Sequence, residues 1–200
     1  MKKLQFFTVM SLLAVWTAAC NNPNRRAADD SVEQAQDVND TTAMVNEKDA
    51  DFAVKAADAG IAEIERGKLA EEKASDPRIK EFARKMVSDH QKANDELMTL
   101  AARLNITLPP VAGEEHVDKQ RELRETMGTE FDKDFIDLMV KDHHKVVSLF
   151  EDASNDVRNA DLQSFAAKTL PTLKRHQEEA KAIQDSINPM DTTTIQRVIP

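Results

Sequence analysis

Four long segments of the sequence place apolar residues three and four positions apart, the spacing of one face of an α-helix. They cover residues 49–74, 77–104, 129–153 and 160–187, and each would form a helix about 40 Å long at 1.5 Å per residue. The chain has only 4 glycines and 7 prolines among its 200 residues, too few for the many tight turns of an all-β protein. The sequence therefore predicts an all-α fold.

The breaks between the segments predict how the helices are connected. Asp76 supplies an N-cap and Pro77 a first helical residue, and Pro109 with Pro110 follows the end of the second segment. Short turns join the first segment to the second and the third to the fourth, whereas a long connection, able to hold a short helix over 114–126, separates the middle two. Short, long and short connections predict a four-helix bundle with one crossover.

The two predicted hairpins also share a weak internal repeat. The phrases LAEEKASD (residues 69–76) and FARKMV (82–87) return as LFEDASND (149–156) and FAAKTL (165–170). We interpret the second hairpin as a diverged copy of the first, although two polar amphipathic hairpins could share such phrases by coincidence.

Each predicted helix carries one side chain able to bind a metal in the middle of its apolar face. These side chains are Glu63, His90, Asp142 and His176. Counting from the turns places the two members of each hairpin within about one helical turn of each other in height. A lone buried carboxylate costs several kcal/mol, so four such groups need a common explanation. Two carboxylates and two imidazoles around one cation supply it.

This ligand set predicts Fe, Mn or Zn as the cofactor, and Met86 and Met139 on the same stripes leave copper open. Three further side chains are auxiliary candidates that would have to rotate to reach the ion: His143, Asp89 and Glu179. Small residues on either side of Glu63 are expected to let its helix approach a neighbour closely and to leave room for an ion.

The same residues also permit a core without a metal. Asp142 could accept a hydrogen bond from His90 or His176, and Glu63 could pair with a lysine. The buried polar groups would then serve only to fix the register of the helices.

The first twenty residues have the organisation of an export signal. Lys2 and Lys3 precede an apolar stretch too short to span a bilayer, and small residues then lead to Cys20, the only cysteine. This order resembles a bacterial lipoprotein signal, which implies a lipidated Cys20, attachment to the membrane through that lipid, and a periplasm-facing location. Asn21 after the cysteine favours the outer membrane. A plain secretory signal cut near Ala19 is the alternative.

Polar segments flank the predicted helices. After a signal peptide over 1–19, residues 20–48 comprise the lipidated cysteine and a predicted flexible tether. The helical domain covers 49–187, and residues 188–200 form a C-terminal tail.

Composition excludes several classes of protein. The formal net charge of −9 disfavours sequence-independent binding to nucleic acid. A single cysteine excludes a disulfide framework, a cysteine zinc site and a cysteine-ligated iron–sulfur cluster within one chain. No nucleophile elbow, Walker loop or dinucleotide-binding glycine motif is present. Protein partners are left open.

The phrases KMVSDHQK (residues 85–92) and LMVKDHHK (138–145) resemble a bacterial ferritin-like family of unknown function, often labelled as outer-membrane or exported proteins. The resemblance covers about residues 49–187 and implies a four-helix ferritin-like bundle, but no reaction. The ferritin-like di-iron pattern places a glutamate three residues before a histidine on two helices. Val87 and Leu173 stand at those positions here, which favours a mononuclear or degenerate site.

The sequence thus predicts an exported, lipid-anchored helical bundle that binds a transition metal, in envelope stress or metal handling. An envelope interaction module with a metal-free polar core is the alternative. A third hypothesis is a metal-dependent oxidase or peroxide-handling enzyme, so whether the protein is an enzyme stays open.

Overall fold

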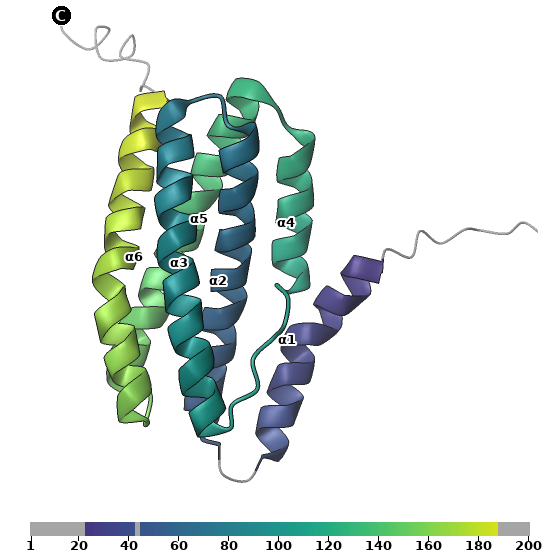
Figure 1. Cartoon of the computed structure of the whole chain (residues 1–200), viewed down its shortest axis with the longest axis vertical. Helices are drawn as coiled ribbons and strands as arrows, with labels where there is room; N and C mark the ends of the chain where they lie inside the picture. Colours follow the sequence, from purple (N-terminus) through teal and green to yellow (C-terminus); the bar gives the residue numbers. More distant parts are fainter. Residues whose placement is uncertain (1–22, 43–44, 188–200) are drawn as a thin grey trace, which may run out of the picture.

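The computed structural model describes residues 23–42 and 45–187, and all regular secondary structure within them is helical. This confirms the all-α prediction. Six helices follow one another along the chain (Figure 1): α1 (Pro23–Thr41), α2 (Glu47–Lys73), α3 (Pro77–Leu104), α4 (Glu114–Glu125), α5 (Gly128–Asp156) and α6 (Ala160–Ile187).

The four long helices α2, α3, α5 and α6 lie side by side and form a helical bundle (Figure 1). The most extensive contacts are those between α2 and α3 and between α5 and α6, and α2 also packs on α5 and α3 on α6. Each long helix therefore has two long neighbours. The long connection between α3 and α5 contains α4, so the predicted short, long and short connectivity and the short helix over 114–126 are confirmed.

Aspartates near the N-terminal ends of α2 and α5 join the two hairpins reciprocally. The carboxylate of Asp132 on α5 accepts hydrogen bonds at 2.8 Å from the backbone N–H groups of Ser75 and Asp76, in the turn between α2 and α3. The carboxylate of Asp49 on α2 accepts from the N–H groups of Arg158 and Asn159, in the turn between α5 and α6. This reciprocity is what a duplicated hairpin would produce.

Helices α3 and α5 begin in different ways. Asp76 caps α3 by accepting a hydrogen bond from the N–H of Arg78 at 2.8 Å, as predicted. Helix α5 begins at Gly128, one residue before the segment predicted over 129–153. Met127 is the N-cap, without a side-chain hydrogen bond, and Gly128 follows it with a φ of 61°, a backbone conformation that glycine adopts readily.

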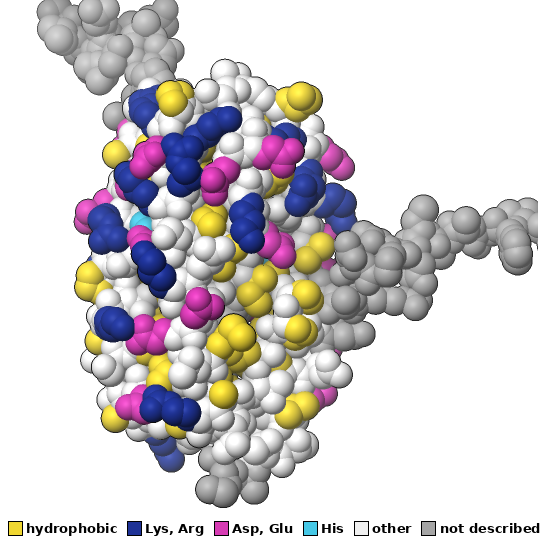
Figure 2. All heavy atoms as spheres, in the orientation of Figure 1, with side chains coloured by type: hydrophobic (Ala, Val, Ile, Leu, Met, Phe, Trp, Pro, Cys, Tyr) yellow, Lys and Arg dark blue, Asp and Glu magenta, His cyan; other side chains and the backbone are white. Residues whose placement is uncertain are grey.

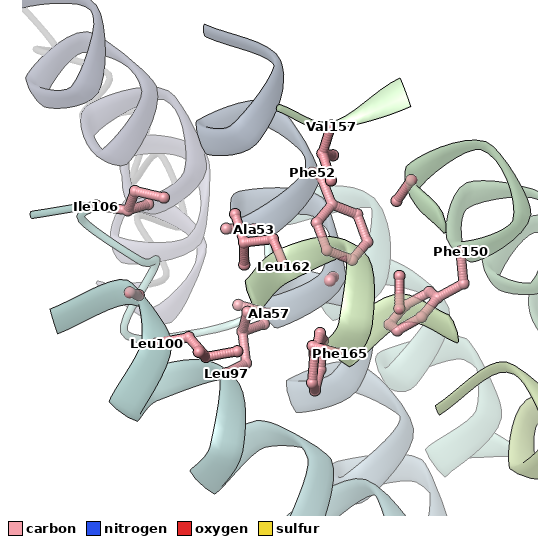
Figure 3. Close-up of a cluster of buried hydrophobic side chains, with 14 of the residues drawn as sticks. Phe52, Ala53, Ala57, Leu97, Leu100, Ile106, Phe150, Val157, Leu162 and Phe165 are labelled. Atoms are coloured by element: carbon pink, nitrogen blue, oxygen red, sulfur yellow. The ribbon is translucent and has the colours of Figure 1, made fainter. Parts of the chain in front are cut away.

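Two apolar clusters fill the interior, one toward each end of the bundle. The lower cluster lies near the start of α2 and the end of α3, which are at the bottom of the bundle in Figure 1. It contains Phe52, Phe150 and Phe165, which contact one another and are labelled in Figure 3. The upper cluster is built around Phe82 and Phe135. Buried polar side chains lie between the two clusters, half-way along the long helices.

The predicted flexible tether over 20–48 does not hold for residues 23–41, because they form α1. This helix is anchored to the long connection by Asn39, whose amide donates to Thr107 O at 2.9 Å and accepts from Thr107 N at 2.7 Å. Ser31 Oγ also donates to Val111 O at 3.0 Å. The predicted signal peptide over 1–19, the predicted lipidation site Cys20 and the predicted tail over 188–200 lie outside the described residues.

Charged side chains of both signs share the face of the molecule that Figure 2 shows. Figure 2 shows Lys and Arg side chains interspersed with Asp and Glu on the visible face, with apolar side chains between them. Among the residues that the structure describes, no helix combines the length and apolar character needed to cross a bilayer.

Candidate metal centre

Each of the four long helices contributes one metal-competent side chain to the polar layer between the apolar clusters. Glu63 comes from α2, His90 from α3, His143 from α5 and His176 from α6. Their exposed fractions are 1%, 5%, 0% and 1%, so the bundle removes all four from water.

The three histidines form a compact group. Each offers one ring nitrogen, and these three nitrogens lie within 4.8 Å of one another. The ring centroids are 5.4–5.7 Å apart. Two nitrogens bound to one tetrahedral zinc ion at about 2.1 Å lie about 3.4 Å apart, so an ion would draw the most widely separated nitrogens together by up to about 1.4 Å.

The polar contacts of the rings leave one nitrogen of each without a hydrogen bond in the described chain. His143 Nδ1 lies 3.0 Å from Met139 O, His176 Nε2 lies 3.1 Å from Asp89 Oδ2, and His90 Nδ1 lies 3.2 Å from Glu63 Oε2. Among the described residues, His90 Nε2, His143 Nε2 and His176 Nδ1 have no hydrogen-bond partner. In metal-binding histidines, one ring nitrogen commonly donates a hydrogen bond to a carboxylate or carbonyl, and the other ring nitrogen binds the metal. His143 and His176 have that arrangement, and His90 places its Nδ1 beside the Glu63 carboxylate at 3.2 Å.

Burial also keeps two of these imidazoles in the form that binds metals. Burial, helped by the neighbouring imidazoles, lowers the pKa of His176 to about 4. Burial likewise lowers the pKa of His90, although the charge of Glu63 opposes the shift. Both rings are therefore neutral at neutral pH, and each keeps a nitrogen lone pair for an ion.

Glu63 adds a negative charge beside the rings. Its Oε2 lies 3.2 Å from His90 Nδ1 and its Oε1 lies 3.5 Å from His143 Nδ1, but neither oxygen has a well-oriented hydrogen bond within the described chain. Burial raises the pKa of this carboxyl, but in the acid range where it titrates, attraction to the protonated forms of the surrounding histidines and to Arg66 outweighs that effect and holds the pKa below its ordinary value. The site therefore contains a buried carboxylate able to bind a cation.

Asp142 was predicted as a ligand, but the structure places its carboxylate on Arg66. Arg66 Nη1 donates to Asp142 Oδ2 at 2.7 Å, and both side chains are almost fully buried. Arg66 Nη2 also lies 2.9 Å from His116 Nδ1 and donates to His116 O at 3.3 Å. The neighbouring His143, predicted only as an auxiliary, takes the place of Asp142 in the group.

The other auxiliary candidates lie toward the surface. Asp89 accepts hydrogen bonds from His176 and from Arg175 Nη2, the latter at 3.2 Å, so it supports a ring of the group. Glu179 pairs with Lys85 at 3.0 Å. Asp89 and Glu179 both line a surface hollow of about 400 Å³ whose wall includes His176.

Two glycines bring α2 close to α3 on either side of Glu63. A Cβ at Gly67 would lie 2.4 Å from Val87 Cγ2, and a Cβ at Gly60 would lie 2.2 Å from Asn94 Oδ1. Real Cβ atoms do not approach other atoms so closely. The predicted close approach around Glu63 is therefore confirmed.

Comparison with known proteins identifies a family but no activity. The family model described as a domain of unknown function, DUF4142, matches residues 34–183. No curated protein matches the chain, and no solved structure matches it. The family description gives neither a ferritin-like fold nor a cellular location, so both stay predictions.

Proposed function

The chain belongs to the DUF4142 family, whose function is unknown. We propose that this protein binds one transition metal ion. The ligands are His90, His143 and His176, with Glu63 beside them. The observation that carries this proposal is that three buried imidazoles face one another, each with one nitrogen unpartnered in the described chain.

The free energy of the polar layer supports an ion. A buried polar atom without a hydrogen bond costs about 1–3 kcal/mol, and the three rings and Glu63 together contain five such atoms in the described chain. A metal ion bound by the free nitrogens would compensate for several of these atoms at once. A divalent cation would also neutralise the charge of Glu63, which Arg66 cannot do fully because Asp142 pairs with it.

The donor set narrows the choice of metal. The predicted pair of carboxylates and pair of imidazoles suited Fe, Mn or Zn. Replacing Asp142 by His143 gives three nitrogens and one carboxylate, and imidazole donors suit Zn and Fe better than Mn. We therefore propose Zn or Fe as the native ion.

The bundle supports a ferritin-like arrangement with one ion rather than two. Its four long helices and single long crossover are those of ferritin-like bundles. The positions of the two bridging glutamates are occupied by Val87 and Leu173, which are 8% and 2% exposed. An apolar side chain at each position leaves no bridging carboxylate for a second ion.

We further propose that the protein acts in the cell envelope as an exported lipoprotein. The support is the lipoprotein-like signal and Cys20. Expression of the whole chain in a Gram-negative host tests it: the wild type should sediment with outer membranes, and Cys20→Ser should appear in the periplasmic fraction. Equal distribution of the two proteins would contradict lipid anchoring.

Metal analysis with matched histidine variants tests the central proposal. Protein purified without chelator, or loaded with Zn²⁺ or Fe²⁺, should hold one ion per chain, and X-ray absorption should show nitrogen ligands at about 2.0–2.1 Å. His143→Gln should lose this ion. His144→Gln, which changes the exposed neighbour on α5, should keep it.

The metal-free alternative predicts the opposite result. If the polar layer only fixes helix register, His143→Gln and His144→Gln bind equally little metal, and added Zn²⁺ leaves the thermal stability of both unchanged.

A further inference from the structure

A small cavity lies next to the candidate metal centre. Its volume is about 10 Å³, which is room for about one water molecule. Glu63 and His90 line it at one end, and most of its remaining wall is apolar, including Phe150, Phe165 and Leu173.

Small side chains create this cavity. Ala56 on α2 and Ala93 on α3 line it, and so does Gly60, where a Cβ would meet the Asn94 side chain on the same wall. Ala93, Asn94 and Thr169 on its wall are only half-buried, so the cavity lies between the buried polar layer and the surface at α3 and α6.

The polar atoms at its inner end lack partners. Glu63 is 1% exposed and neither of its carboxylate oxygens has a well-oriented hydrogen bond in the described chain, and His90 Nε2 has none. A cavity with apolar walls and unpartnered polar atoms at one end provides both space for a ligand and a group to bind it.

We propose that this cavity admits a small ligand of one or two heavy atoms, such as water, hydroxide or a diatomic gas, to an open coordination position of the bound metal. This inference rests on the proposed metal site. Three histidines and one carboxylate leave positions open on an iron ion, which accepts up to six ligands, and the cavity is the space beside them. Glu63 can accept a hydrogen bond from a ligand that carries a proton.

The size of the cavity predicts discrimination between ligands. A diatomic molecule that extends from the metal needs little more space than one water. A five-membered ring such as imidazole does not fit without displacing the phenylalanines of the lower apolar cluster. The apolar wall also favours an uncharged ligand over a hydrated ion.

Nitric oxide binding to the anaerobic Fe²⁺-loaded full chain tests the inference. Metal content is measured first, and electron paramagnetic resonance then detects the iron–nitric oxide complex. We expect nitric oxide to bind and added imidazole to leave the iron spectrum unchanged. Thr169→Leu, which places a larger side chain on the cavity wall, should weaken nitric oxide binding at least 10-fold. Thr172→Leu is the matched control, because Thr172 lies on α6 but not on the cavity wall, and it should bind like the wild type.

The outcomes separate the two proposals. Stoichiometric iron without a nitric oxide signal overturns the small-ligand inference and leaves the metal site standing. Equal binding by Thr169→Leu and Thr172→Leu also overturns it, because the cavity would then not be the ligand's position. A chain that holds neither iron nor zinc overturns both proposals, whereas a chain that holds zinc but no iron overturns only the small-ligand inference. Should Thr169→Leu fail to fold, Ala93→Leu makes the same test from α3.

Discussion

The carboxylate of Asp89 accepts a hydrogen bond from His176 Nε2 while 28% of its side chain stays exposed. It therefore connects a fully buried ring to the surface and fixes which nitrogen of that ring stays free. Such partners of metal-binding histidines orient the ring and increase its basicity, and their loss typically costs 10–100-fold in metal affinity.

Asp89→Asn should therefore weaken metal binding by roughly 10–100-fold without preventing folding. The amide keeps the size of the side chain but loses its charge. Isothermal titration of the metal-free protein with Zn²⁺ measures the change, and Asp95→Asn, an exposed substitution on the same helix, is the control. Equal affinities for the two variants would show that Asp89 does not support the site.

The burial of His176 predicts how the metal-free protein responds to acid. Its pKa is lowered from 6.5 to about 4 in the folded state, so between these values the unfolded chain binds a proton that the folded chain does not. The associated stability is fully present above about pH 6.5 and is lost as the pH falls toward about 4. Between about pH 7 and pH 5, the free energy of unfolding should fall by about 2 kcal/mol more in the wild type than in His176→Gln.

Urea unfolding at both pH values measures this difference. The variant corrects for the carboxylates that titrate over the same range, because it retains all of them. If the free energy of unfolding had the same pH dependence in the wild type and in His176→Gln, His176 would be protonated as easily in the folded chain as in the unfolded one.

Three members of the site could be predicted from the sequence because each interrupts an apolar stripe. Glu63, His90 and His176 are such interruptions, and the structure brings them to one layer. The choice between Asp142 and His143 could not be made, because both are buried and point about 100° apart on α5. Which of them meets the other histidines depends on how α5 is rotated against its neighbours. Arg66 follows Glu63 by three residues, so the two side chains share a helix face. This spacing was the sequence feature that could have predicted the burial of Arg66.

At the scale of helices, the packing of α2 against α3 depends on glycine. Gly67 faces Val87, whose β-branched side chain is stiff. Gly60 faces the far end of the flexible Asn94 side chain instead. The two glycines should therefore tolerate a methyl group differently, although both lie within the same helix.

Gly67→Ala should destabilise the protein by about 1 kcal/mol. Overpacking costs about 1–3 kcal/mol, and the better helix propensity of alanine offsets about 1 kcal/mol of it. Gly60→Ala, in which Asn94 can rotate away, should be neutral or slightly stabilising. Urea unfolding compares the two, and Gly67→Ala combined with Val87→Ala should relieve the clash. Equal stability of the two single variants would contradict this account of the α2–α3 contact.

A buried ion pair connects α2 with α5, and its arginine also contacts α4. Arg66 contacts Asp142 on α5 and both the ring and the backbone oxygen of His116 on α4. Removing one partner of such a pair leaves an uncompensated charge away from water, which costs about 3–5 kcal/mol. The pair therefore fixes the position of the crossover helix beside the bundle.

Asp142→Leu should lower the free energy of unfolding by about 3–5 kcal/mol. The double variant Arg66→Met with Asp142→Leu removes both charges and should regain much of that loss. Glu81→Ala, which breaks the exposed pair with Arg84, should cost less than about 1 kcal/mol. A double variant less stable than Asp142→Leu would show that Arg66 stabilises the fold without its carboxylate partner.

The extents of the long helices were largely predictable, because amphipathic periodicity and breaks are local signals. Residues 77–104 and 160–187 were predicted with the bounds that α3 and α6 have, and α2 and α5 differ by a few residues. Helix α1 was missed because its sequence is mostly polar. Contacts far away in the sequence hold it, such as those between Asn39 and Thr107, and no local pattern reveals them.

At the scale of the whole molecule, the candidate ligands come from different helices and sit between two separate apolar clusters. The nitrogens meet only when α3, α5 and α6 are packed together. An ion bound by all three rings would therefore bind the folded chain and have little affinity for the unfolded one. Binding of that kind stabilises the fold in proportion to the logarithm of ligand concentration.

Metal should accordingly raise the melting temperature of the whole bundle. At a free Zn²⁺ concentration 100 times the Kd, the stabilisation is about 2.7 kcal/mol, which corresponds to roughly 5–10 °C for a domain of this size. Differential scanning calorimetry of the chelator-treated protein, with and without Zn²⁺, measures the shift. His90→Gln should abolish it and His144→Gln should retain it, because only His90 belongs to the buried group. A shift of the same size in both variants would place the ion on surface carboxylates, and the buried histidines would then be a polar layer that only aligns the helices.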